Sequence, residues 1–317
     1  SSFQQFPDLI LSNTDFDNQL IISQANPQQA DYAWGSIELI KWKDGHGEEV
    51  HGLLVKPDNF DPSKKYPMIV NFYERSSSRL HSHRAPFPHR STINYSYYSN
   101  RGYVIFNPDV RYKEGYPGRS CEEAVMSGVD YVLSMGFVDE SRMALQGHSW
   151  GGYQIAHLLT KTNRFKCAES GAPVVNMISA YGGIRWGSGM SRMFQYERTQ
   201  SRLGFTLWER PDLYLENSPI FNMDKVETPV LILATRSLRA TGVSTRKSAL
   251  MRCRGMCISP KPTPTLTKNQ RRAAISEEIE KIEEELRLTI DPSLLPIPRP
   301  GVLGLPAEGR LTQEYGQ

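Results

Sequence analysis

The stretch RMALQGHSWGGYQIAHLLT, from Arg142 to Thr160, decides how this chain folds. RMALQG is typical of a strand, and WGGYQIAHLLTKT is typical of an amphipathic helix. Between them, Gly147-His148-Ser149-Trp150-Gly151 matches the G-x-S-x-G pattern of a sharp strand-to-helix turn. Flanking glycines let backbone segments pack closely around such a turn and leave the serine hydroxyl exposed at the sheet edge. The pattern therefore predicts that Ser149 is a nucleophile.

Apolar strands and helices alternate on both sides of this turn. SIELIKW and EEVHGLLVKP are expected strands, joined at Asp44-Gly45, which is a hairpin signal. Further strands are expected at Pro67–Tyr73, at Tyr103–Asp109, within KCAESG and at Thr228–Ala234. A helix is expected in CEEAVMSGVDYVLSMG, whose apolar residues fall on one face. Continuous apolar strands alternating with helices predict an α/β fold, doubly wound around a mostly parallel sheet.

The composition is that of a globular protein. The 317 residues are 39% hydrophobic and 22% charged, and the net charge is +3. Residues 236–317 hold 14 Lys and Arg against nine Asp and Glu, so the basic excess lies in the tail. The larger part of the chain gives no reason to expect nucleic acid as a partner. No apolar run approaches the ~18 residues of a membrane span, so none is predicted.

Cysteines and the N-terminus add little about location. The four cysteines suggest neither a disulfide framework nor a zinc site; they are Cys121, Cys167, Cys253 and Cys257. The chain opens SSFQQFPDLI, without an initiator methionine or a signal-peptide pattern. We therefore expect a processed or truncated product, and its compartment and oligomeric state stay open.

The chain divides into four expected segments. Residues 1–35 are a polar lead-in, and residues 36–235 contain the predicted α/β domain. Residues 236–274 are basic and rich in Pro and Thr toward their end, and they predict a disordered linker. Residues 275–317 contain a short amphipathic helix and a Pro-rich tail. The helix has coiled-coil spacing at Ile275, Ile279, Ile282 and Leu286.

Three stretches together resemble a known family. GHSWGGYQ, the upstream GYVIFNPDVRYKEGYPG and the downstream NSPIFNMDKVETPVLIL resemble the catalytic domain of the prolyl oligopeptidase family of serine peptidases. The resemblance runs from about Ser36 to Leu233. It implies an α/β-hydrolase fold that follows a β-propeller, so residues 1–35 could be a propeller remnant. It also implies peptide or oligopeptide substrates and no cofactor.

The same resemblance indicates an oxyanion site. The backbone N–H of the residue after the nucleophile helps to bind the oxyanion in this fold, which here is Trp150. In dipeptidyl-peptidase-like members, a tyrosine at the end of an earlier strand donates its hydroxyl to the same oxyanion. Tyr73, in IVNFYERSS, stands at the matching place. Relatives commonly continue with Gly-Pro there, whereas this chain has Glu74-Arg75.

The other two members of a triad are missing from their expected places. The order in this fold is Ser, then Asp or Glu, then His. The acid is expected after the strand at Thr228–Ala234, where relatives read H-G-x-x-D but this chain reads ATRSLRATGV. No Asp or Glu lies between Glu227 and Glu277, and no His follows His157. We find no triad acid and no triad base, and we predict that this chain is inactive or nearly so.

The remaining histidines are poor substitutes for the base. His157 lies eight residues after Ser149, which is about 12 Å along a helix, so we expect it in packing or at the surface. His148 precedes the nucleophile and should point away from it. Three more histidines lie in the loop after the Tyr73 strand, at His81, His83 and His89. A substitute base or an H-x-H metal pair in this loop is an alternative, but we predict no metal site. Glu169 could be an acid at a strand end.

The tail suggests why the triad is incomplete. DPSLLPIPRPGVLGLPAEGRLTQEYG, after a glutamate-rich helix, resembles the lead-in to lysostaphin-type zinc endopeptidases. None of that family's His and Asp zinc ligands is present. Our hypothesis is that a hydrolase domain was cut at about Ala234 and joined to unrelated sequence, as a fusion or an error. Three alternatives stay open: a carboxylesterase of the same fold, a non-catalytic degenerate hydrolase acting as a binding protein, and a truncated zinc endopeptidase.

Overall fold

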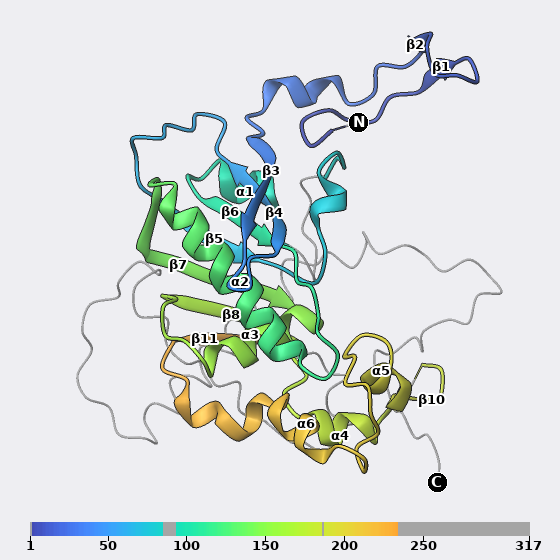
Figure 1. Ribbon diagram of the computed structural model, residues 1–317. Coiled ribbons are helices and arrows are strands. Elements are labelled where there is room, and N and C mark those ends of the chain that lie inside the picture. Colours follow the sequence, from blue (N-terminus) through green and yellow to red (C-terminus); the bar gives the residue numbers. More distant parts are fainter. Residues whose placement is uncertain (1, 85–92, 186, 234–317) are drawn as a thin grey trace, which may run out of the picture. The chain divides into compact units, whose positions relative to one another are not determined.

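The computed structural model describes residues 2–84, 93–185 and 187–233 (Figure 1). In this part of the chain, a seven-stranded sheet has the order β11-β8-β7-β5-β6-β4-β3. The strands are β3 (Ser36–Lys43), β4 (Glu49–Lys56), β5 (Tyr66–Asn71), β6 (Val104–Pro108), β7 (Val138–His148), β8 (Cys167–Gly171) and β11 (Val230–Leu233). The five strands from β6 to β11 along the sheet are parallel, and β3 and β4 are antiparallel. The predicted α/β-hydrolase fold with its mostly parallel sheet is confirmed.

The described residues also form six α-helices, three 3-10 turns and two short antiparallel ribbons. The helices are α1 (Tyr95–Ser99), α2 (Pro117–Ser134), α3 (Trp150–Leu159), α4 (Met177–Tyr181), α5 (Met193–Glu197) and α6 (Pro211–Glu216), with 3-10 turns η1 (Pro27–Asp31), η2 (Ser77–Arg79) and η3 (Pro219–Lys225). Two small antiparallel ribbons pair β1 (Ile10–Ser12) with β2 (Gln19–Ile21) and β9 (Ile184–Arg185) with β10 (Met190–Ser191). The strands β1 and β2 lie in the lead-in, where the sequence showed no period. Strands of three residues are too short to show one.

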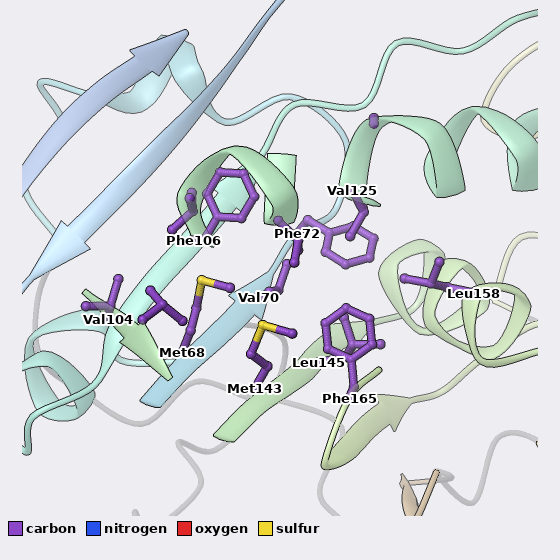
Figure 2. Packing of buried hydrophobic residues seen from close by; sticks show 14 of the residues in the cluster. Met68, Val70, Phe72, Val104, Phe106, Val125, Met143, Leu145, Leu158 and Phe165 are labelled. Carbon is purple, nitrogen blue, oxygen red and sulfur yellow. The ribbon is translucent and has the colours of Figure 1, made fainter. Parts of the chain in front are cut away.

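One face of the sheet packs against α2 and α3. Alternate residues of the parallel strands point to this face and fill the space below the helices (Figure 2). They include Met68, Val70, Val104, Met143 and Leu145, all at most 2% exposed. The helix α2 begins with Pro117 in its first turn, where its missing N–H costs nothing. The helical face expected from the sequence is the buried face of α2.

The opposite face carries a row of polar side chains near the carboxyl ends of the strands. The Nε2 of Gln146 on β7 donates to the Oε2 of Glu169 on β8 at 2.7 Å. The side chain of Asn71 on β5 donates to the Oε1 of Gln146 and accepts from the hydroxyl of Tyr95. The register places Asn71 beside Gln146 and Gln146 beside Glu169. These bonds fix the strands relative to one another just before the loops that carry the site.

The β3–β4 hairpin is confirmed, but its turn is not centred on Asp44-Gly45. The two strands pair up to Lys43 opposite Glu49, so five residues make the connection. The Asp44 carboxylate accepts from the N–H groups of residues 46 and 48. Gly47, at φ 82°, occupies the left-handed conformation that closes the turn.

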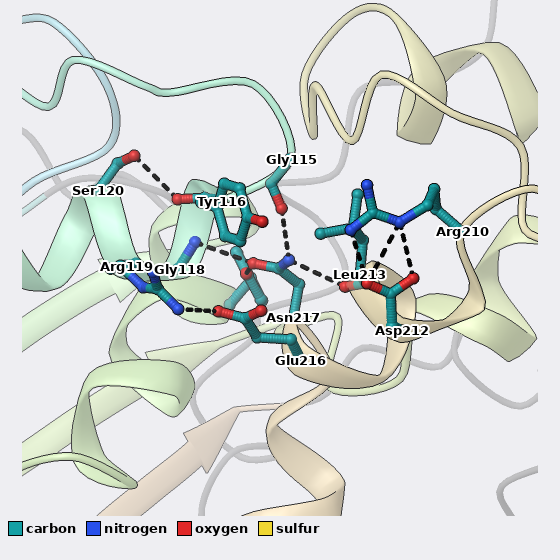
Figure 3. A network of polar contacts seen from close by, with 11 residues as sticks. Gly115, Tyr116, Gly118, Arg119, Ser120, Arg210, Asp212, Leu213, Glu216 and Asn217 are labelled. Carbon is teal, nitrogen blue, oxygen red and sulfur yellow. Dashed lines mark hydrogen bonds and ion pairs between the residues drawn. The ribbon is translucent and has the colours of Figure 1, made fainter.

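A second group of helices lies around the first turns of α3. Aromatic side chains from α3, α4, α5 and α6 pack into one cluster: Trp150, Tyr153, Tyr181, Tyr196 and Tyr214. Asn217 joins α6 to the start of α2 (Figure 3). Its amide donates to the carbonyls of Gly115 and Leu213 and accepts from the Gly118 N–H and the Tyr153 hydroxyl. All four hydrogen-bonding positions of this buried amide are therefore used.

Several expectations lie outside the described residues. These are the linker at 236–274, the helix and tail at 275–317, the expected break in the hydrolase domain at about Ala234, and the residues His89, Cys253 and Cys257.

Candidate active site

Ser149 stands at a strained turn between β7 and α3. The strand ends at His148 and the helix begins at Trp150, as the sequence predicts. Ser149 has φ 59° and ψ −111°, a conformation that L-residues rarely adopt and that costs about 1–3 kcal/mol. Two backbone bonds hold it: the Ser149 N–H donates to the Gly171 carbonyl at 2.7 Å, and the Tyr153 N–H donates to the Ser149 carbonyl at 3.0 Å. Such a turn is the geometry of a nucleophile elbow.

The glycines around the turn have steric roles. A Cβ on Gly147 would lie 2.9 Å from the Gly151 carbonyl carbon, and one on Gly151 would lie 2.6 Å from the Phe72 carbonyl oxygen. Gly152, which the sequence analysis did not single out, is as constrained, since a Cβ there would lie 2.4 Å from the Gly171 oxygen. The three glycines let the start of α3 touch the ends of β5, β7 and β8. The signal for Gly152 was its place directly after the G-x-S-x-G pattern.

Trp150 offers its backbone N–H at the start of α3. As the first residue of the helix, it has no preceding turn whose carbonyl could accept from this N–H, which also lies at the positive end of the helix dipole. The indole is 3% exposed and stacks on Tyr153 at 4.5 Å between ring centroids. Its Nε1 donates to the hydroxyl of Tyr112 at 2.9 Å. The side chain is thus anchored, and the N–H stays available at the elbow.

Tyr73 lies beside this helix start. It follows β5 closely, and its Cα is 3.8 Å from the position of a Cβ built on Gly151. The Tyr73 carbonyl accepts from the Gln154 Nε2 at 2.6 Å and from the Tyr112 hydroxyl at 3.3 Å. The single proton of the Tyr112 hydroxyl is shared between this carbonyl and the Gln154 Oε1, which is closer at 2.8 Å, and burial raises the pKa of Tyr112 well above its ordinary value. Neutral Tyr112 and Gln154 therefore fix the backbone of Tyr73 against α3.

The Tyr73 hydroxyl ends a directed chain of hydrogen bonds. Arg185 donates to the Oε1 of Gln195 at 2.7 Å, and Gln195 donates through its Nε2 to the Oε1 of Gln200 at 2.9 Å. Gln200 then donates through its Nε2 to the Tyr73 hydroxyl oxygen at 2.7 Å. Since a guanidinium can only donate, Arg185 sets the orientation of both amides. Tyr73 must accept from Gln200, and its own O–H is left to donate elsewhere.

The Glu74-Arg75 pair replaces the Gly-Pro that relatives commonly have after this tyrosine. Glu74 forms an ion pair with Arg202, whose guanidinium carbon lies 4.9 Å from the centroid of the Tyr112 ring. The Glu74 carbonyl accepts from the Val110 N–H at 2.8 Å. The Glu74 side chain therefore links the loop after β5 to Arg202, a contact that glycine could not make, whereas its bond to Val110 uses the backbone alone.

Three of the described histidines, His157, His148 and His83, lie in closely packed surroundings. His157 is 3% exposed and lies against Gly118, where a Cβ would be 2.4 Å from the imidazole. Burial lowers the pKa of His157 to about 4, so the ring is neutral near pH 7. The Nδ1 of His148 lies 2.6 Å from the position of a Cβ on Gly171. His83 stacks on Trp34 at 5.3 Å between ring centroids, and burial lowers its pKa.

Glu169 is the acidic residue that the sequence offered as a possible acid at a strand end. Glu169 lies in the polar row described above, and burial raises its pKa while the bond from Gln146 opposes the shift. Within the described ranges, no group of three His, Cys, Asp or Glu side chains could hold a metal ion. None of the described helices combines the length and apolar character needed to cross a membrane.

The comparisons with known proteins agree with this geometry. Residues 88–238 match the model of the prolyl oligopeptidase family. Dipeptidyl-peptidase 5 of Schizosaccharomyces pombe is 24% identical over 240 residues, which cover 67% of this chain and 33% of that protein. Prolyl endopeptidase FAP of Mus musculus is 33% identical over 153 residues, which cover 44% of this chain and 19% of that protein. The chain spans about a third or less of the length of the curated relatives it matches.

Solved structures share the fold. An acylaminoacyl peptidase of Pyrococcus horikoshii superposes with a TM-score of 0.56 at 17% identity, covering 73% of this chain and 36% of that chain. A putative dipeptidyl aminopeptidase IV of Bacteroides ovatus superposes with a TM-score of 0.54 at 24% identity, covering 73% of this chain and 32% of that one.

Proposed function

Because this chain belongs to the prolyl oligopeptidase family of serine peptidases, we propose that Ser149 is the nucleophile that attacks the carbonyl of a peptide substrate. The observation that carries the proposal is the backbone of Ser149, which is held at a positive φ between β7 and α3. An elbow of this kind presents the Oγ above the sheet edge, where a carbonyl can approach it. Attack would give an acyl-enzyme on Ser149 and release the amine.

Two groups would stabilise the negative charge that develops on the carbonyl oxygen. The Trp150 N–H is at the right place in the chain, and its helix dipole favours an anion there. The Tyr73 hydroxyl would be the second donor. Its proton is available because Gln200 already donates to its oxygen. Gln200 and, behind it, Gln195 and Arg185 would act as positioning residues.

We further propose that a polypeptide of these 317 residues turns over slowly, because it contains no histidine after His157. Without a base, the Ser149 hydroxyl stays a weak nucleophile and the leaving amine receives no proton. In a comparable triad, loss of the histidine lowers turnover on the order of 10⁶-fold. Catalysis by the oxyanion site and by binding would remain.

The same observation favours a second candidate, a hydrolase-fold binding protein that performs no reaction. A peptide p-nitroanilide and a p-nitrophenyl ester distinguish the candidates when both are assayed with this chain and with Ser149→Ala. Imidazole is added as a replacement base. The peptidase proposal expects hydrolysis of both substrates that depends on Ser149 and rises with imidazole. Ester hydrolysis alone would indicate an esterase, and identical rates for the two proteins would indicate a binding protein.

A further inference from the structure

We propose that a cavity beside the elbow binds a carboxylate of a peptide, either an acidic side chain or a C-terminus. The cavity has a volume of about 280 Å³ and is lined by Val50, His51, Arg75, Ser77, Ser78, Asp109 and Arg111. This volume is at the lower end of those of small-molecule sites, so one side chain or chain end of a larger ligand can enter it. The ligand class rests on the proposed peptidase function, and the binding itself does not require catalysis.

The cavity lies at the same edge of the sheet as Ser149. Arg75 follows Tyr73 by two residues, so their Cα atoms are no more than about 7.6 Å apart. Arg111 precedes Tyr112, whose hydroxyl accepts from the Trp150 indole. Both arginines are in loops after parallel strands, Arg75 after β5 and Arg111 after β6. The strand β5 is the neighbour of β7, which carries the elbow. A peptide bound at Ser149 could therefore reach the cavity with a nearby residue.

The one acidic group in the lining is already occupied. The Asp109 carboxylate, on a residue that is 6% exposed, accepts from the N–H groups of Ser76 and Ser77 and from the Ser77 hydroxyl. These three donors hold the loop after β5 and disperse the negative charge. Asp109 forms no ion pair with a described residue, and it shapes the cavity floor.

The side chains of the two arginines, by contrast, donate no hydrogen bond to another residue that the structure describes. Both are exposed, and neither forms an ion pair with any residue that the structure describes. Guanidinium groups bind planar carboxylates through paired N–H donors. His51 is less available, because its Nε2 lies 2.9 Å from the Glu49 carboxylate.

The charge balance favours a monoanion. Arg75 and Arg111 together exceed Asp109 by one positive charge, which a single carboxylate neutralises. A phosphate dianion would leave one negative charge in excess next to the buried Asp109, and burying unbalanced charge is costly. A carboxylate is therefore the better ligand, and its source is the question for experiment.

The proposal is tested by ligand binding to the full chain carrying Ser149→Ala. This variant lacks the nucleophile, so binding is measured without catalysis. Isothermal titration compares N-acetyl-glutamic acid amide, which has only a side-chain carboxylate, with acetyl-Gly-Gly, which has only a terminal one. N-acetyl-glutamine amide is the neutral match, and inorganic phosphate is the dianion. We expect one of the two acids to bind at least about tenfold more tightly than the neutral amide and phosphate. The tighter acid identifies the source of the carboxylate.

Arginine variants complete the test. We expect Arg75→Gln and Arg111→Gln each to remove most of the preference for the acid. Arg79→Gln, an exposed arginine of η2 outside the cavity, should leave the preference unchanged. Equal affinity for the acids and the neutral amide, stronger binding of phosphate, or an unchanged preference in both cavity variants would overturn the proposal. Failure of Ser149 to react with substrates would leave these binding results as they are.

Discussion

Gln200 donates a hydrogen bond of 2.7 Å to the hydroxyl oxygen of Tyr73, although 127 residues separate them in the chain. Because Tyr73 accepts this bond, its own O–H proton must point away from Gln200 and is left to donate elsewhere. A chain of amides that begins at Arg185 sets its direction. If Tyr73 is the oxyanion donor that we propose, Gln200 is the residue that positions it.

Acylation of Ser149 by p-nitrophenyl acetate in imidazole should fall roughly 10²-fold in Tyr73→Phe, as for the loss of one oxyanion donor. Gln200→Leu should lower the acylation rate less, because the Tyr73 hydroxyl keeps its proton and loses only the bond that orients it. Gln200→Glu should lose more than Gln200→Leu, since a carboxylate would accept the Tyr73 proton instead. Gln24→Leu, at an exposed glutamine of the lead-in, is the control. Equal rates in Gln200→Glu and Gln200→Leu would show that the direction of the bond is unimportant.

Gly152 should tolerate no side chain. Alanine there would place its Cβ 2.4 Å from the Gly171 oxygen, so α3 and β8 would have to separate. We expect Gly152→Ala to lower the free energy of unfolding by about 1–3 kcal/mol or more, the usual cost of overpacking. Gly182→Ala is the matched control, because a Cβ at Gly182 meets nothing within 4 Å and its φ is −74°. Urea titrations of both variants measure the difference in their free energies of unfolding. Equal values would mean that α3 and β8 accommodate the Cβ at little cost.

Relieving the backbone strain at Ser149 should raise the free energy of unfolding. Ser149→Gly and Ser149→Ala both remove the hydroxyl, but only glycine adopts φ 59° and ψ −111° without a Cβ clash. We expect the glycine variant to be about 1 kcal/mol more stable than the alanine variant, after the greater freedom of glycine in the unfolded chain is subtracted. At an unstrained position the order is reversed. Thermal unfolding of the pair decides, and a more stable alanine variant would argue against a strained elbow.

The fold was largely readable from the sequence because long apolar strands and helices have clear periods. The strand before Ser149 and the helix after it came out within a few residues. The strands β1 and β2 did not, since three residues carry no period, and the turn after β3 closes at Gly47 rather than at Gly45.

The site was readable only in part. The elbow has a local pattern, so Ser149 and its glycines could be found. Gln195 and Gln200 could not, because their proposed role depends on α5 and the loop after it meeting Tyr73, which is far away in the chain. The cavity lined by Arg75 and Arg111 likewise joins three separate strand ends, and no local pattern announces it.

Stability should decline between pH 6.5 and 4 because of His157. Burial lowers its pKa to about 4, whereas an unfolded chain binds the proton near pH 6.5. The unfolded state therefore gains protons first as the pH falls, and up to about 3 kcal/mol of stability present above pH 6.5 is lost across this window. The lowered pKa values of carboxylates such as Asp139 act below about pH 4. Unfolding free energies measured by urea at several pH values test this.

His157→Gln should flatten that profile, whatever its effect on stability at pH 7. His46→Gln, at a histidine whose side chain is 69% exposed, should not. Burial also lowers the pKa of His83, so His83→Gln serves to subtract its share. An unchanged slope in His157→Gln would mean that other groups govern the acid loss of stability.

The role of Ser149 is tested most directly by the site at which the chain is acylated. Intact-protein and peptide mass spectrometry after p-nitrophenyl acetate, with and without imidazole, locates the acetyl group. We predict one acetyl group on Ser149, formed faster as imidazole is added and absent from Ser149→Ala. Acetylation spread over surface lysines and serines, equal in both proteins and unaffected by imidazole, would contradict the proposal that Ser149 is an elbow nucleophile without its triad acid and base.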